Sequence, residues 1–180
     1  SEGIVRHFAY VAEHSELPLI VYNVPGRTGV SCTPEHYARL AEIPRINGVK
    51  EASGDISLVS RTRYLCGDAL NIWSGNDDQT LPMLALGAKG VISVASNIVP
   101  QVMATLCAAA LSGDFFTARA IHEAYAGLFD ALFYEVNPIP VKTAMQMLGW
   151  DSGRLRLPLC PMAEENAAKL QNCLESLQLL

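Results

Sequence analysis

Short apolar runs recur along this chain and are separated by longer segments of mixed apolar and polar positions. Four runs are predicted as strands, at residues 17–24, 46–52, 71–74 and 90–94. The segment 1–14 carries apolar residues at positions 4, 5, 8, 11 and 12, which is the spacing of an amphipathic helix. Further helices are predicted at residues 34–42, 56–66, 100–111, 115–133, 138–148 and 161–179. One more is predicted to begin after Asp77 or Asp78 and to end at about residue 86.

Capping residues mark the start of several of these helices. Thr33 precedes Pro34, which is an N-cap followed by a proline at the first helical position. Asp55 is predicted to cap the helix over 56–66, and Asp77 or Asp78 to cap the next one. Two adjacent aspartates could also bind a metal, but capping is the better interpretation.

The order of these elements predicts an α/β fold with parallel strands. Four strand–helix units follow the first helix, which is typical of βαβ architecture. No Gly-x-Gly-x-x-Gly follows a strand, so a TIM barrel is favoured over a Rossmann sheet. We expect residues 1–112 to form the C-terminal half of a (β/α)8 barrel and residues 113–180 a helical C-terminal domain.

Half of an eight-stranded barrel cannot close on itself, since about eight strands are needed for an interior that side chains fill. We therefore expect the chain to be incomplete. The strands at 19–24 and 91–94 should lack closing partners among these 180 residues.

Composition narrows the class of protein further. The net charge of -5 argues against nucleic-acid binding, and no apolar run is long enough to span a bilayer. The five cysteines are scattered and form no Cys-x-x-Cys pair, which indicates reduced thiols in the cytoplasm. The four histidines show no metal-ligand spacing.

Lys50 is the strongest candidate for chemistry. It lies near the end of an apolar strand, where burial can lower the pKa of an amine and expose its nucleophilic lone pair. Proteins prepare a Schiff-base lysine for carbonyl substrates in this way. Tyr22 lies near the end of the preceding strand, so both side chains should meet at one edge of a parallel sheet. A lysine that has reached solvent and a tyrosine that only packs remain alternatives.

Two further cations accompany this pair. Arg27 lies in the turn-rich loop after the first strand, where its planar guanidinium would suit a carboxylate, although a plain surface arginine fits the same position. Lys142 follows Asn137-Pro138-Ile139-Pro140-Val141 and is a secondary amine candidate.

Five motifs make a family resemblance specific. They are YNVPGRTG at 22–29, GVKEASG at 48–54, SGND at 74–77, GVISV at 90–94 and NPIPVK at 137–142. In this order and spacing the chain resembles the dihydrodipicolinate synthases, a family of class I pyruvate-dependent aldolases that also includes N-acetylneuraminate lyase. The resemblance covers essentially all 180 residues and matches the C-terminal part, a little under two-thirds, of a typical member.

The resemblance implies a role for each candidate residue. Lys50 would form the Schiff base with pyruvate, and Tyr22 would relay protons. Arg27 would hold the carboxylate of aspartate semialdehyde, while backbone atoms of Gly75 and Ile92 would line the pyruvate pocket. No metal or organic cofactor is implied. The family suggests a homotetramer. Its other relay residues belong to the N-terminal half of the barrel and have no counterpart here.

The implied reaction condenses pyruvate with L-aspartate 4-semialdehyde to 4-hydroxy-tetrahydrodipicolinate, in the diaminopimelate route of lysine biosynthesis. The arginine five residues after the tyrosine favours this synthase reaction over lyases of 2-keto sugar acids such as N-acetylneuraminate. Those lyases are one alternative, and a non-catalytic barrel fragment that keeps the lysine is the other.

Overall fold

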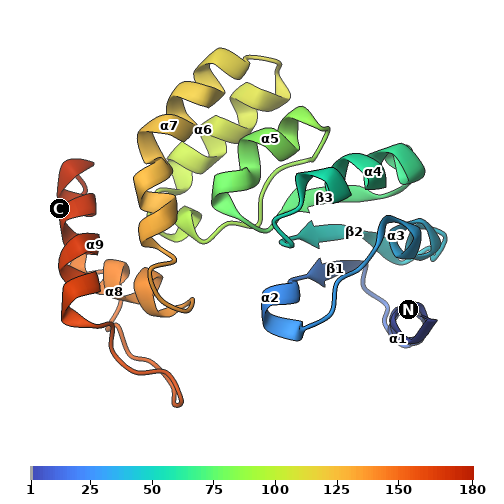
Figure 1. Ribbon diagram of the computed structural model, residues 1–180, viewed down its shortest axis with the longest axis horizontal. Coiled ribbons are helices and arrows are strands. Elements are labelled where there is room, and N and C mark those ends of the chain that lie inside the picture. Colours follow the sequence, from blue (N-terminus) through green and yellow to red (C-terminus); the bar gives the residue numbers. More distant parts are fainter. Residues whose placement is uncertain (1) are drawn as a thin grey trace. The chain divides into compact units, whose positions relative to one another are not determined.

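The computed structural model describes residues 2–180 (Figure 1). The chain forms two compact units. The first unit extends to Ile92 and the second covers residues 93–180. The boundary falls ahead of position 112, the end of the barrel portion in the sequence analysis. The reason is that helix α6 (Pro100–Leu111) packs against α7 (Phe115–Ala131) and so joins the second unit.

The first unit combines parallel strands with helices. Its elements, in chain order, are α1 (Glu2–Glu13), β1 (Leu19–Asn23), α2 (Pro25–Thr28), α3 (Pro34–Ala41), β2 (Ile46–Glu51), α4 (Ile56–Cys66), η1 (Gly67–Ala69), β3 (Asn71–Ser74), η2 (Asp77–Gln79) and α5 (Thr80–Ala85). The predicted α/β class, the first three strands and the helices between them are therefore confirmed. The short helix α2 was not predicted, because its turn-rich sequence indicated a loop.

The three strands form one parallel sheet in the order β1-β2-β3, with β2 in the middle (Figure 1). Tyr22 is the Cα partner of Lys50, and Lys50 is in turn the partner of Trp73. These residues lie near the carboxyl ends of their strands. Parallel pairing therefore brings the predicted site residues to the same edge of the sheet.

The predicted fourth strand at 90–94 is wrong as a strand. Only one parallel bridge forms there, between Val91 and Ser74, supported by hydrogen bonds from Ser74 N to Gly90 O and from Ile92 N to Ser74 O, each 2.9 Å. Gly90 has a φ of 151°, and the chain enters the 3-10 helix η3 (Ala95–Asn97) directly afterwards. An apolar run confined between these two features is too short for a ladder.

The two faces of the sheet differ in burial. On one face Val21, Val49 and Ile72 are each no more than 2% exposed and pack with Tyr37 and Leu40 in the core of the unit. On the other face, residues of β1 at alternate positions remain accessible, with Ile20 46% and Tyr22 45% exposed. The amphipathic helices thus cover one side, and the site residues lie on the other.

Side-chain caps position two of these helices as predicted. Thr33 accepts a hydrogen bond from His36 N at 3.3 Å, and the His36 ring accepts one from Thr33 N at 3.0 Å. Asp55 accepts from Leu58 N at 3.1 Å. The prediction that Asp77 or Asp78 caps the next helix is wrong, because both lie inside η2 and the N-cap positions of η2 and α5 are Asn76 and Gln79.

The second unit is helical within residues 93–180. It contains η3, α6, α7, α8 (Ile139–Met147) and α9 (Glu164–Ser176). Helix α9 packs against α7 and α8, and its start is held by Glu135, which accepts hydrogen bonds from Ala163 N and Asn166 Nδ2, each at 2.9 Å. The predicted helical C-terminal region is confirmed, with ends shifted by a few residues. No helix among the described residues has the length and apolar character that crossing a membrane requires.

Candidate active site

Lys50 and Tyr22 are in direct contact. The Nζ atom of Lys50 lies 4.3 Å from the centre of the Tyr22 ring, a cation–π distance. Neighbouring parallel strands hold the two residues in register, and the half-exposed face of the sheet leaves both accessible. The prediction that strand order brings this amine and this phenol together is confirmed in geometry.

The surroundings of Lys50 favour its neutral form. Burial lowers the pKa of the amine below its ordinary value, and the positive charge of Arg27 lowers it further. The carboxylate of Asp77 acts in the opposite direction and raises it. Burial is the largest of these effects, so the net pKa of Lys50 is lowered, which increases the fraction of neutral, nucleophilic amine.

Gly75 lies against the strand that carries Lys50. Its N–H donates to Glu51 O at 2.7 Å, and a Cβ at this position would lie 2.6 Å from the Ala52 Cβ and 3.2 Å from the Lys50 Cγ. Only glycine fits this close approach without moving the strand. Close packing beside the Lys50 side chain therefore explains why this position is a glycine.

Arg27 and Ile92 stay exposed, as Tyr22 does. Arg27 belongs to α2, which begins with Pro25 and ends at Gly29, whose φ of 68° suits glycine. Burial is the main cause of the lowered pKa of Lys50, and the positive charge of Arg27 adds to it. Ile92 is 39% exposed, and its N–H is used by Ser74 O, so its backbone nitrogen belongs to the sheet bridge.

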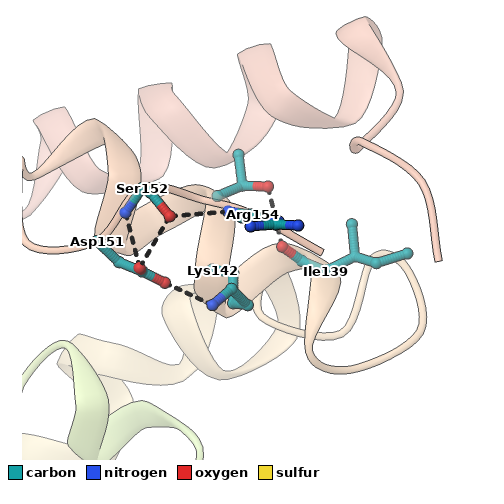
Figure 2. Close-up of polar contacts among 6 residues, drawn as sticks. Ile139, Lys142, Asp151, Ser152 and Arg154 are labelled. Carbon is teal, nitrogen blue, oxygen red and sulfur yellow. Dashed lines mark hydrogen bonds and ion pairs between the residues drawn. The ribbon is translucent and has the colours of Figure 1, made fainter. Parts of the chain in front are cut away.

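Lys142, the secondary amine candidate, is occupied by an ion pair. Its Nζ lies 2.6 Å from Asp151 Oδ2, and Figure 2 shows this pair beside Ser152 and Arg154. The hydrogen bond from Lys142 and a second one from Ser152 N lower the pKa of the Asp151 carboxyl. A paired ammonium is a poor nucleophile, so the geometry favours Lys50 over Lys142 for carbonyl chemistry.

A buried polar cluster behind Lys50 was not anticipated from the sequence. Glu51 is 2% exposed and accepts hydrogen bonds from Asn23 Nδ2, Tyr37 Oη and Ser53 N. Burial and the negative charge of Glu51 raise the pKa of the Tyr37 hydroxyl, which therefore stays protonated and donates. The alternation of side chains along β2 could have indicated this cluster. Glu51 points to the same buried face of the sheet as Val49, and a carboxylate at a buried position needs hydrogen-bond donors.

The site can therefore supply a nucleophilic amine, a phenol beside it and an exposed guanidinium. Among residues 2–180 no group of three or more His, Cys, Asp or Glu side chains is placed to hold a metal ion. Fold and site together define the class: an α/β protein with a partly buried lysine beside a tyrosine at the carboxyl end of a parallel sheet.

Comparison with known proteins identifies the family. Residues 1–177 match the model of the dihydrodipicolinate synthetase family, so the chain belongs to this family. It is 49% identical over 179 residues to the 4-hydroxy-tetrahydrodipicolinate synthase of Geobacter sulfurreducens and 50% identical over 181 residues to that of Persephonella marina. Each match covers 99% of this chain but 62% of the relative. The chain thus spans about three fifths of these relatives' length, which agrees with the predicted fraction.

Solved structures give the same result. The crystal structure of dihydrodipicolinate synthase from Thermotoga maritima superposes with a TM-score of 0.96 at 44% identity, covering 99% of this chain and 62% of that one. A structure of the Acinetobacter baumannii enzyme, described as chloride inhibited and complexed with pyruvate, gives a TM-score of 0.97 at 41% identity with the same coverage.

Proposed function

We propose that this chain provides the Schiff-base site of a 4-hydroxy-tetrahydrodipicolinate synthase, which condenses pyruvate with L-aspartate 4-semialdehyde in lysine biosynthesis. The observation that carries the proposal is the contact between Lys50 Nζ and the Tyr22 ring at 4.3 Å, on partnered strand positions. Membership of the family and the relatives named as this synthase support it.

In the proposed reaction the neutral amine of Lys50 attacks the ketone carbon of pyruvate. Loss of water gives an iminium, and loss of a methyl proton from the bound pyruvate gives an enamine. The enamine carbon attacks the aldehyde of the second substrate. The amino group of that substrate then displaces Lys50 from the imine carbon, which closes the ring and frees the amine.

Each remaining candidate residue has a proposed role in this sequence. The phenol of Tyr22, whose ring contacts the Lys50 amine, moves protons during imine formation and cyclisation. Arg27 holds the carboxylate of aspartate semialdehyde through its guanidinium. Gly75 and Ile92 line the pyruvate pocket, Gly75 because it can approach the Lys50 side chain where a larger residue cannot.

The remainder of the catalytic unit is proposed to come from residues outside this chain. Within residues 2–180 the strand β1 is an edge strand of the sheet, and its Ile20 and Tyr22 side chains stay exposed. A barrel half with this open edge needs further strands to enclose the site. We further propose a homotetramer in the cytoplasm; the five cysteines, none of which forms a disulfide within residues 2–180, agree with a reducing compartment.

The test is reductive trapping with pyruvate and borohydride, followed by peptide mass spectrometry. It is run on this chain alone and on the completed protein, by which we mean this chain joined to the part of the Geobacter sulfurreducens relative that the match leaves uncovered. A pyruvate-derived adduct at Lys50 is expected in the completed protein. An adduct at Lys142 or Lys89 instead would overturn the assignment.

The same material separates the proposed reaction from its alternatives. Completed protein that turns over aspartate semialdehyde with pyruvate supports the synthase. Cleavage of N-acetylneuraminate without synthase activity would make the chain part of a sugar-acid lyase. If no adduct forms in the completed protein, the remaining alternative is that this chain is a non-catalytic fragment of a barrel.

A further inference from the structure

A buried side-chain bond ties the carboxyl ends of β1 and β2 together. Asn23 is the last residue of β1 and Glu51 the last of β2, and the two are 3% and 2% exposed. The Asn23 Nδ2 donates to both carboxylate oxygens of Glu51, at 3.0 and 3.1 Å. This bond adds to the backbone ladder at the position where the site residues lie.

The remaining partners of Glu51 fix its carboxylate from two other sides. Tyr37 Oη donates to it at 2.5 Å from α3, and Ser53 N donates at 2.7 Å from the segment after β2. Asn23 is held as well, since its Oδ1 accepts from Cys32 N at 3.1 Å. All partners of the carboxylate are hydrogen-bond donors, which is what a buried charge without an ion pair requires.

The polar cluster and the site residues occupy opposite faces of the sheet. Tyr22 and Lys50 come one position before Asn23 and Glu51 on the same strands, and side chains alternate along a strand. Glu51 therefore does not face the amine. Any effect on the chemistry must pass through the backbone of the two strand ends.

The register of β1 on β2 is the quantity such a bond would control. The ladder is irregular between Leu19 and Ile20, at the beginning of the pairing. The pairing shifts by one residue at this point, since Leu19 is partnered with Ile46 and Ile20 with Gly48. A one-residue slip would move every side chain to the other face and separate Tyr22 from Lys50.

We propose that Glu51 and Asn23 are a positioning pair, which holds the ends of β1 and β2 in the register that places the phenol of Tyr22 beside the amine of Lys50. This inference rests on the proposed function, because it concerns the same amine and phenol. Neither residue is a catalytic residue, since neither faces the reacting atoms.

Three variants test the direction of the bond. Glu51→Gln introduces an amide donor among groups that donate, and Asn23→Asp places two carboxylates in contact in a buried site. The double variant Asn23→Asp/Glu51→Gln exchanges acceptor and donor while keeping the shape and the total charge. In the double variant the Gln amide can donate to the Asp carboxylate, and Asp can still accept from Cys32 N.

Two measurements on the completed protein separate positioning from activity. The first is the maximal rate of borohydride trapping at saturating pyruvate, together with its pH profile. The second is the NMR chemical shift of the Lys50 ε-methylene protons in protein with labelled lysine. Those protons are on the carbon bonded to Nζ, which lies 4.3 Å from the centre of the Tyr22 ring, so we expect the ring to shift them upfield whether or not pyruvate reacts.

In each single variant we expect trapping to fall about tenfold, the effect of leaving a buried donor or acceptor unpaired. The upfield shift should decrease in parallel. The double variant should restore both readouts. The apparent pKa of trapping should stay unchanged, because the charge of Glu51 is on the far face and only the placement of the amine is altered.

Asn71→Ala is the matched control. It removes the bond from Asn71 Nδ2 to Asn47 Oδ1, 2.9 Å long, at the opposite end of the same sheet. Both readouts should stay at the wild-type level in this variant.

The outcomes distinguish this proposal from the proposed function. A wild-type protein that shows the upfield shift but forms no adduct contradicts the proposed function. The role of the positioning pair is then tested by comparing the shift between the variants and the wild type. Single variants that keep the wild-type shift overturn the positioning pair, even if the adduct forms normally. A double variant as impaired as the singles also overturns it, because that result indicates a general packing defect.

Discussion

Tyr22 and Lys50 are Cα partners on adjacent parallel strands, and the Lys50 Nζ lies 4.3 Å from the centre of the Tyr22 ring. The contact uses the ring, whereas the proposed proton transfer uses the hydroxyl. Removing the hydroxyl alone therefore separates the two contributions.

Tyr22→Phe keeps the ring beneath the amine and removes the proton relay. We expect the condensation rate of the completed protein to fall about 10²–10⁴-fold, the usual contribution of general acid–base catalysis. The unfolding midpoint in urea should change little, because Tyr22 is 45% exposed. Tyr64→Phe, at a residue 88% exposed on α4, serves as the control and should leave the rate unchanged. Equal rates for wild type and Tyr22→Phe would remove Tyr22 from the mechanism.

The pH dependence of trapping should respond to the two charges near Lys50 in opposite directions. Only the neutral amine reacts, so the rate rises with pH and levels off above the pKa of Lys50. This pKa lies below the ordinary value for a lysine. Arg27→Ala removes a positive charge, so the pKa rises and the profile moves to higher pH. Asp77→Asn removes a negative charge and moves the profile to lower pH.

These shifts are measured from trapping rates at saturating pyruvate across the pH range. Below the plateau, each unit of pKa change alters the rate about tenfold at fixed pH. Plateau rates serve as the control for misfolding, since a purely electrostatic change leaves them unaltered. Profiles that move in the same direction in both variants would contradict the electrostatic account.

Arg27 should also determine the second substrate. In Arg27→Ala we expect kcat/KM for aspartate semialdehyde to fall about ten- to a hundred-fold, from the loss of a charged hydrogen bond worth roughly 1.5–3 kcal/mol. Imine formation with pyruvate, compared at the plateau pH, should change far less. Arg61→Ala, on the exposed side of α4, is the control. Equal losses for both substrates would make Arg27 a structural residue.

Much of this arrangement could be predicted because local sequence determines it. Apolar runs at β1, β2 and β3 and the caps Thr33 and Asp55 depend on short-range patterns. Parallel pairing then brings the strand ends together without further information. The adjacency of Tyr22 and Lys50 followed from these rules alone.

The features that were missed depend on contacts between distant residues. The run at 90–94 resembles a strand, but a strand needs a partner along its length, and Val91 finds one bridge to Ser74. Glu51 reads as a polar residue at a strand end. Strand alternation hints at its burial, but its partners cannot be read from the local sequence, because the donors Asn23 and Tyr37 come from other elements.

The ion pair between Lys142 and Asp151 should contribute to stability in a pH-dependent way. Because the pKa of Asp151 is lowered in the folded state, the contribution is complete above the ordinary carboxyl pKa and is lost as pH falls through the lowered value. Asp151→Asn should therefore lower the urea midpoint at neutral pH and have no effect at the acid end. Lys142→Met should show the same pattern, and the double variant should lose no more than either single change.

Trapping at Lys50 should persist in both variants, because Lys142 is not the nucleophile in the proposed reaction. A midpoint difference between Asp151→Asn and wild type that grows as the pH falls would contradict the sign argued here. Loss of the Lys50 adduct in a folded Lys142→Met protein would return Lys142 to consideration as the reactive amine.

Gly75→Ala tests whether the close approach beside Lys50 is required. The added methyl group would lie 2.6 Å from the Ala52 Cβ and 3.1 Å from Glu51 O, so β2 and the segment after β3 must separate. That separation weakens the 2.7 Å bond from Gly75 N to Glu51 O and displaces the Lys50 side chain. We expect a lower urea midpoint and at least a tenfold slower trapping at Lys50, as overpacking typically costs about 1–3 kcal/mol.

Gly3→Ala is the matched control: its added methyl meets no atom within 4 Å, so helix α1 should be unchanged or slightly stabilised. Wild-type trapping in Gly75→Ala would mean that the pocket tolerates a side chain there and that glycine is not needed beside the amine.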